Sequence, residues 1–133
     1  HSFTQLLPRG LMVAALSNAI DNAIYWTRFR KERDGRKEPN AILVLSHWDD
    51  ETGGLIAVVD NGPGFQLPQD QLGRPFSSTR AGGMGLGLFY CKTVMESIGG
   101  KLDVVEASAL NDIVDIPAAY DGAAIIFSFK HNK

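Results

Sequence analysis

Two glycine-rich clusters about 20 residues apart constrain this chain more than any other feature of its sequence. The first is Asp60–Phe65 (Asp-Asn-Gly-Pro-Gly-Phe), which follows an apolar run. The second is Gly82–Leu88 (Gly-Gly-Met-Gly-Leu-Gly-Leu), which opens a run with helical spacing. Glycine permits positive φ angles and lets the backbone approach a flat ligand, because no Cβ stands in the way. The two clusters therefore indicate a ligand site formed by backbone at a strand end and at a helix start.

The size and composition of the chain favour one ordinary globular domain. Its 133 residues, with 44% hydrophobic and 21% charged residues, are typical of a single domain spanning 1–133. The net charge of -2 argues against a nucleic-acid partner. The sequence has neither an apolar stretch that could span a bilayer nor a recognisable signal peptide. We expect His1-Ser2 to be a cloning remnant and the chain to be a fragment of a longer protein.

Three features are expected to be structural. Cys91 is the only cysteine, so it cannot form an internal disulfide, and within a helical run it should be buried and inert. The basic stretch Arg28–Lys37 is interrupted by acidic residues, which favours a solvated helix end and turn over a polyanion site. His47 and His131 fall in a predicted strand and in the C-terminal tail.

Hydrophobic periodicity predicts two helices and four strands. The predicted helices are Pro8–Arg33 and Gly85–Ile98, and the predicted strands are Ala41–Trp48, Leu55–Val59, Lys101–Ala107 and Gly122–Lys130. Between the last two strands, Ser108–Asp121 is expected to form a loop. This order predicts an α+β fold, a two-layer sandwich with helices packed on one face of a mixed β-sheet.

The same spacing identifies the residues that should face the core. In the first helix they are Met12, Leu16, Ala19, Ile20, Ala23 and Thr27, and in the second they are Leu86, Phe89, Tyr90, Val94 and Ile98.

Asp60 ends an apolar strand and enters the first glycine cluster, where Gly62 and Gly64 would leave room for a flat base. An ionised carboxylate only accepts hydrogen bonds, so it can select the exocyclic amine of adenine against a base that offers a carbonyl there. The alternative is a hairpin-like turn with an exposed aspartate.

The second cluster leads directly into a helix, whose free N–H groups and positive dipole end suit a phosphate chain. Arg80, just before it, could add charge-assisted contacts to phosphate. The alternatives are a loop tip before an ordinary helix and a solvated arginine.

Asn18 and Asn22 are neighbours one turn apart on the first helix. Their amide oxygens suit a hard cation such as Mg²⁺, which takes few protein ligands when nucleotide phosphates supply the others. The alternative is that both are ordinary exposed polar positions.

Four motifs in this order resemble the N, G1, F and G2 boxes of a known ATPase superfamily. They are Asn18–Ala23, Asp60–Phe65, Arg74–Arg80 and Gly83–Leu88. The superfamily comprises type II topoisomerases, a heat-shock chaperone, sensor histidine kinases and mismatch-repair proteins. Within it the chain is most similar to the catalytic domain of sensor histidine kinases. The resemblance implies the Bergerat ATP-binding fold.

The resemblance also implies roles for individual residues, with ATP and Mg²⁺ as cofactors. Asn22 would bind Mg²⁺, and Asn18 and Asn22 would be the catalytic positions. The nucleotide site would comprise Tyr25, Asp60, Gly62, Gly64, Phe76, Thr79, Arg80, Gly83, Gly85, Leu86 and Gly87.

Four positions distinguish this chain from other members of the superfamily that it resembles. ATP-hydrolysing members carry a glutamate one turn before the metal-binding asparagine, and this chain has Asn18. An amide cannot act as a general base, so Asn18 favours phosphoryl transfer over hydrolysis. Many kinases place a basic residue where this chain has Tyr25, and Thr-Thr where it has Ala123-Ala124.

The expected function is therefore that of an ATP-binding catalytic domain that transfers the γ-phosphoryl group to a histidine. That histidine would lie on a dimerisation segment absent from this chain, so the chain alone is expected to be inactive in transfer. The implied partners are ATP or ADP, this segment in a homodimer and a response regulator. The implied location is the cytoplasm, as a free protein or as part of a membrane-anchored sensor. The alternatives are an ATP-dependent conformational module and a nucleotide-binding domain without transferase activity.

Overall fold

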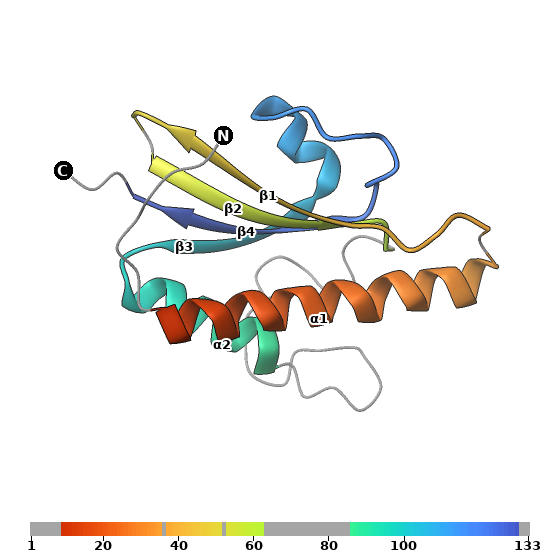
Figure 1. Cartoon of the computed structure of the whole chain (residues 1–133), viewed down its shortest axis with the longest axis horizontal. Helices are drawn as coiled ribbons and strands as arrows, with labels where there is room; N and C mark the ends of the chain where they lie inside the picture. The colour runs from red at the N-terminus through yellow and green to blue at the C-terminus, as the bar shows by residue number, and fades with distance from the viewer. Residues whose placement is uncertain (1–8, 36, 52, 63–85, 131–133) are drawn as a thin grey trace.

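Two helices, four strands and one short 3-10 helix make up the described part of the chain (Figure 1). The computed structural model describes residues 9–35, 37–51, 53–62 and 86–130. In chain order the elements are α1 (Arg9–Asp34), β1 (Ile42–Asp49), β2 (Gly53–Asp60), α2 (Leu86–Ser97), β3 (Lys101–Glu106), η2 (Ala107–Asp112) and β4 (Ala123–Phe129). Every predicted helix and strand is confirmed to within two residues, and the expected helix starts Pro8 and Gly85 lie outside the described ranges.

Small side chains let α1 lie close against the sheet. A buried stripe at helical spacing is formed by Met12, Ala15, Ala19 and Ala23. Thr27 extends it, and the Thr27 hydroxyl donates to the carbonyl of Ile24 at 3.0 Å, so this buried polar group is satisfied. Leu16 and Ile20 pack against the same core while partly exposed. The predicted face of α1 is therefore confirmed, with Ala15 as an addition.

The buried side of α2 agrees in part with the predicted one: Val94 is buried, and Tyr90 and Ile98 pack against the same core while partly buried. Phe89 is instead 38% exposed, and Cys91 and Met95 are buried. The prediction placed Phe89 inside because of its helical spacing, but contact with α1 rotates the helix toward its smaller side chains. The thiol of Cys91 donates to the carbonyl of Ala15 at 3.1 Å, an approach that small residues allow. Burial raises the pKa of Cys91 to about 12, which agrees with the predicted inert thiol.

Glycines end both helices. Gly35 follows α1 with φ of 62°, and Gly99 follows α2 with φ of 76°, a conformation that strains any residue with a Cβ. The N–H of Gly100 donates to the carbonyl of Met95 at 2.8 Å, which satisfies the open end of α2. Within the described ranges, no helix combines the length and the apolar composition needed to cross a bilayer.

The sheet has the strand order β1-β2-β4-β3, and its three described pairings are all antiparallel. Among the described strands no neighbours run parallel, whereas the prediction was of a mixed sheet. Because β2 and β3 are both antiparallel to β4, β3 runs parallel to β2, as it does after a crossover connection. The two are not neighbours, because β4 lies between them.

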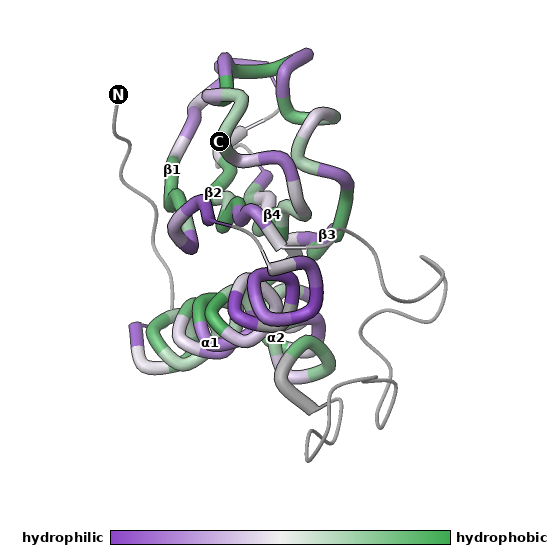
Figure 2. The backbone as a smooth tube through the Cα atoms, turned by 90° about the vertical axis from the view of Figure 1, so that its right-hand side faces the viewer, coloured by the Kyte–Doolittle hydropathy of each residue, from purple (hydrophilic) through white to green (hydrophobic). Residues whose placement is uncertain are grey.

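Each face of the sheet has its own hydrophobic core (Figure 2). The helices cover one face, over side chains that include Val58, Ile125 and Phe127. The segment 107–121, predicted as a plain loop, begins with η2 and covers the other face. Leu110 of this segment is 1% exposed and packs in a cluster with Val59 and Ile126 of the sheet. Both faces of β2 and β4 are therefore covered, which explains the nearly continuous apolar sequence of these strands.

Phe127 of β4 and Phe89 of α2 allow a test of this packing. Phe127→Ala removes a completely buried ring and should lower the free energy of unfolding by about 3–5 kcal/mol. Phe89→Ala, the matched control, should lower it by less than about 1 kcal/mol, because the ring is already partly hydrated. Urea denaturation measures both values, and similar losses for the two variants would contradict the observed orientation of α2.

Candidate functional site

Asp60, the last residue of β2, is a buried carboxylate with an exposed fraction of only 3%. Its Oδ1 atom accepts two backbone hydrogen bonds, from the N–H of Gly62 at 2.8 Å and from the N–H of Ala123 at 3.1 Å. Both bonds go to the same oxygen, and no described residue donates to Oδ2. The alternative of an exposed turn aspartate is therefore excluded, and Oδ2 is available as an acceptor.

The surroundings of Asp60 act on its ionisation in opposite directions. Burial has the largest effect and raises the pKa of Asp60 above its usual range, because it disfavours the charged form. The N–H groups of Gly62 and Ala123 and the positive charge of Arg30 lower this pKa, whereas the negative charge of Asp121 raises it. Removal of any of the three favourable partners would therefore favour protonation of the carboxyl group.

Two glycines allow the close approach that encloses this carboxylate. A Cβ on Gly122 would lie against Asp60 Oδ1 and within 2.6 Å of the Gly62 amide nitrogen, so Gly122 has no room for a side chain. Its own N–H donates to the backbone carbonyl of Asp60 at 2.8 Å. A Cβ on Gly62 would lie 3.2 Å from the backbone of Trp26 on α1. Gly62 does not have the positive φ that was considered for it, so close packing is the reason for glycine here.

Asn61 fixes the turn after β2 to the segment before β1, a role that the sequence analysis did not assign. Its side-chain Nδ2 donates to the carbonyl of Pro39 at 3.0 Å, and its Oδ1 accepts from the N–H of Ala41 at 3.0 Å. The backbone N–H of Asn61 also donates to the carbonyl of Ala41 at 3.2 Å. The motif shows an asparagine next to Asp60, but the partners of this side chain lie about 20 residues away in sequence.

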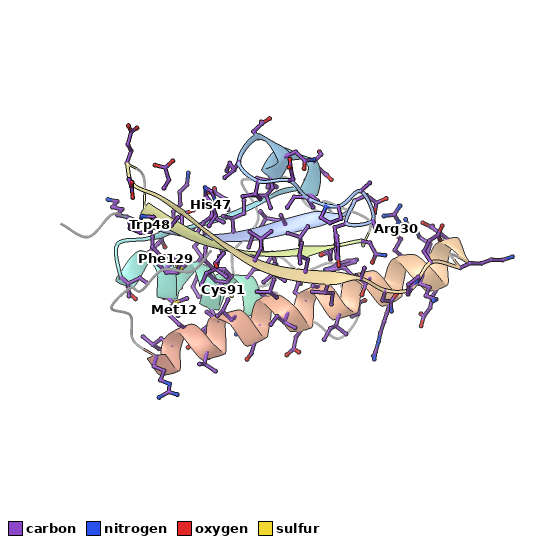
Figure 3. The ribbon with its side chains drawn as sticks, turned by 45° about the horizontal axis from the view of Figure 1, so that its top comes forward. Met12, Arg30, His47, Trp48, Cys91 and Phe129 are labelled. Carbon is purple, nitrogen blue, oxygen red and sulfur yellow. The ribbon has the colours of Figure 1, made fainter. Side chains whose placement is uncertain are left out.

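Arg30 is the second residue that the sequence analysis missed, because the stretch Arg28–Lys37 was assigned to solvent. Figure 3 shows it near the C-terminal end of α1. Its Nη1 atom donates to the carbonyls of Asn61 at 3.1 Å and Gly62 at 2.8 Å, and to Asp121 Oδ1 at 2.9 Å. Its side chain is only 22% exposed. Arg30 also forms an ion pair with Asp34 on the same helix at 3.7 Å. Its three contacts around Asp60 are distant in sequence, so no local pattern distinguishes Arg30 from its basic neighbours.

The α1 residues of the predicted site lie beside the buried stripe of that helix. Asn18 and Asn22 are half-buried, and no described residue forms a hydrogen bond with either side chain. Trp26, one turn after Asn22, packs against Gly62 and thereby connects this part of α1 to the turn after Asp60. Tyr25 lies edge-on to Trp26, with ring centroids 5.0 Å apart. The amide oxygen of Asn22 thus forms no hydrogen bond with a described residue, and as a hard oxygen ligand it suits Mg²⁺.

The remaining predicted site residues belong to the F and G2 motifs. Leu86 and Gly87 are the first two residues of α2. The others lie outside the described residues, and their roles remain predictions; they are Gly64, Phe76, Thr79, Arg80, Gly83 and Gly85.

Comparison with known proteins places this geometry in context. A family model of histidine kinase-, DNA gyrase B-, and HSP90-like ATPases matches residues 9–132. The C4-dicarboxylate transport sensor protein DctB of Rhizobium meliloti (strain 1021) is 33% identical over 91 residues, which cover 67% of this chain and 13% of that protein. The adaptive-response sensory kinase SasA of Prochlorococcus marinus (strain MIT 9313) is 31% identical over 102 residues, which cover 71% of this chain and 25% of that protein.

A solved structure shows the same arrangement of helices and strands. The mycobacterial sensor histidine kinase MprB has a TM-score of 0.67 at 25% identity, over 92% of this chain and 72% of that chain. The chain spans a quarter or less of the length of the two curated relatives.

The ionisation of Asp60 yields a prediction about stability without nucleotide. Because burial raises its pKa in the folded state, its contribution to stability is present below the unfolded pKa and is lost as the pH rises through the folded value. Asp60→Asn keeps an acceptor for the two N–H groups and has no charge to bury. The variant should equal or exceed the wild type in free energy of unfolding at pH 8, and its advantage should shrink at pH 4.

Urea denaturation at the two pH values measures this difference. Asp115→Asn, an exposed position on segment 107–121, is the control and should show no such trend. A loss of stability in Asp60→Asn that is larger at pH 8 than at pH 4 would contradict the assignment, because the ionised carboxylate would then stabilise the fold.

Proposed function

This chain belongs to the histidine kinase-, DNA gyrase B-, and HSP90-like ATPase family, and on that premise we propose that it is the ATP-binding catalytic domain of a sensor histidine kinase. The family match covers residues 9–132, which include all four sequence motifs. The Bergerat fold expected from those motifs is confirmed. Its relatives DctB and SasA are a sensor protein and a sensory kinase, which supports the kinase branch of the family.

The observation that carries the proposal is the half-satisfied carboxylate of Asp60. Two backbone N–H groups hold Oδ1 in place, and Oδ2 has no donor among the described residues. An ionised carboxylate in this state accepts the exocyclic amine of adenine and rejects a carbonyl oxygen. Because the group is buried, an unmatched base would leave it without a partner, and this makes the discrimination strong.

The proposed phosphate end of the site depends on Asn22 and on the start of α2. The Asn22 amide oxygen would be a protein ligand of Mg²⁺, which when bound neutralises phosphate charge. The N-terminal N–H groups of α2, preceded by the second glycine cluster, would face the phosphate chain. Arg80 would add positive charge there.

The proposed reaction transfers the γ-phosphoryl group from ATP to a histidine. A nitrogen of the neutral imidazole forms a bond to the γ-phosphorus as the bond to the β,γ-bridging oxygen breaks, and ADP leaves. Asn18 lies one turn before Asn22 and cannot take a proton, so the described site offers no general base there for hydrolysis. Positioning and charge neutralisation are sufficient for the transfer.

The proposed partners follow from the same function. The phosphoacceptor histidine would lie on a dimerisation segment of the same protein, in a homodimer, and the phosphoryl group would then pass to a response regulator. The domain would work in the cytoplasm, where ATP is available. A response regulator and the dimerisation segment act on the reaction only after ATP has bound, so the nucleotide site can be tested separately.

Transfer can be tested by supplying the missing acceptor. The chain is incubated with ATP carrying a labelled γ-phosphate and with a purified dimerisation segment of a sensor kinase, in excess to offset imperfect recognition. We expect acid-labile label on the segment and little release of free phosphate. Replacement of the acceptor histidine by glutamine is the control. Steady ATP hydrolysis without labelling would instead support the ATP-dependent conformational module, and ATP binding without either reaction would support a binding domain.

The metal role of Asn22 makes a separate prediction. Asn22→Ala should weaken the binding of ATP in the presence of Mg²⁺ by roughly tenfold. Binding of ADP without metal should change much less, because no ligand to the cation is then involved. Calorimetric titration measures both affinities. Ser17→Ala, an exposed position on the same helix, is the control. An equal loss of affinity for ATP with Mg²⁺ and for ADP without metal would show that Asn22 supports the fold and does not bind the metal.

A further inference from the structure

We propose that Arg30 is a positioning residue that sets the preference of this site for adenine over 6-oxo purines. It does so by holding together the backbone that surrounds the Asp60 carboxylate. The inference rests on the proposed nucleotide-binding function and deepens it, because it assigns part of the base specificity to a residue outside the four sequence motifs.

Arg30 holds the turn after β2 directly. Its Nη1 atom donates to two consecutive carbonyls of that turn, those of Asn61 and Gly62, at 3.1 and 2.8 Å. The amide of Gly62 is also one of the two donors to Asp60 Oδ1. The arginine therefore fixes the orientation of the peptide units from which the first of these donors projects. Hydrogen bonds from a charged donor are stronger than neutral ones, which suits this role.

Arg30 also holds the segment that supplies the second donor. The same Nη1 atom lies 2.9 Å from Asp121 Oδ1. The two residues that follow Asp121 both reach Asp60: Gly122 N–H donates to its backbone carbonyl at 2.8 Å, and Ala123 N–H donates to Oδ1 at 3.1 Å. One guanidinium group thus connects α1, the end of β2 and the start of β4 at the point where they enclose the carboxylate.

The side chains of the start of β4 make this backbone support important. Ala123 and Ala124 have no hydroxyl group, so their side chains cannot donate to the Asp60 carboxylate, and the Ala123 N–H is the donor to it from this strand. The position of that N–H depends on the path of the chain through Asp121 and Gly122. Gly122 packs so closely against Gly62 that any side chain would displace it. A small shift of either segment would therefore alter both bonds to Oδ1.

Charge adds to the positional effect. Among the described residues, Arg30 and Asp121 are the charged groups that act on Asp60. Burial favours the protonated carboxyl, and Arg30 opposes it. Because Oδ1 already accepts two N–H groups, a proton would reside on Oδ2 and would convert it from an acceptor into a donor. A donor at Oδ2 matches the 6-oxo group of hypoxanthine or guanine, whereas an acceptor matches the 6-amino group of adenine.

The experiment compares ADP with IDP, which carries an oxo group at position 6 but lacks the extra amine of guanine. Affinities for both nucleotides are measured by calorimetry at pH 6 and pH 8 on the wild type, Arg30→Met and Arg33→Met. Arg33 is the matched control because it lies on the same helix, is 48% exposed, and forms an ion pair with Asp34, as Arg30 also does. We expect Arg30→Met to reduce the ratio of ADP affinity to IDP affinity by roughly tenfold, the equivalent of one charged hydrogen bond. The reduction should be larger at pH 6 than at pH 8.

The ratio of the two affinities does not change if part of a variant is unfolded. Both nucleotides are titrated into the same preparation, so an unfolded fraction lowers both apparent affinities by the same factor. Arg33→Met should keep the wild-type ratio. An unchanged ratio in Arg30→Met, or a wild type that binds ADP and IDP equally, would overturn the inference while leaving nucleotide binding intact. A wild type that binds neither nucleotide would instead refute the proposed function itself.

Discussion

A single buried carboxylate determines the arrangement of the site. Asp60 is almost completely removed from water, and its two hydrogen bonds come from backbone N–H groups on different segments, at Gly62 and Ala123. Burial of an ionisable group without such partners would be strongly unfavourable. The end of β2 and the start of β4 must therefore meet here, and Gly122 has no side chain because that meeting leaves no room for one.

The same carboxylate opposes stability and supports function. Its raised pKa shows that the fold does not fully compensate for the loss of hydration. In the proposed role this is useful, because a buried acceptor with one open oxygen gains a partner only when the correct base binds. Functional sites commonly retain polar groups that weaken the unliganded fold. Arg30 limits the effect here, since its charge and its contacts to the turn and to Asp121 both favour the ionised state.

The elements of the fold, and the position of Asp60 at the end of a strand, could be predicted from local patterns. The alanine stripe of α1, the apolar strands and the glycine stops are properties of short segments, so the predicted bounds hold to within two residues. The orientation of α2 could not, because Phe89 satisfies the helical period as well as Cys91 does. Contact with α1 selects the smaller thiol. The neighbour of β3 could not be predicted either, since strand order depends on which edge the last strand enters.

The sequence by itself determined the family motifs, the α+β class and the position of Asp60 at the end of a strand, because each depends on residues close together in the chain. Only the tertiary structure decided that Asp60 is buried, that segment 107–121 covers the outer face of the sheet, and that Arg30 joins three distant segments. In sequence, Arg30 is one basic residue among several at a helix end. Its partners around Asp60 lie 31, 32 and 91 residues away, so the chain had to fold before this arginine differed from its neighbours.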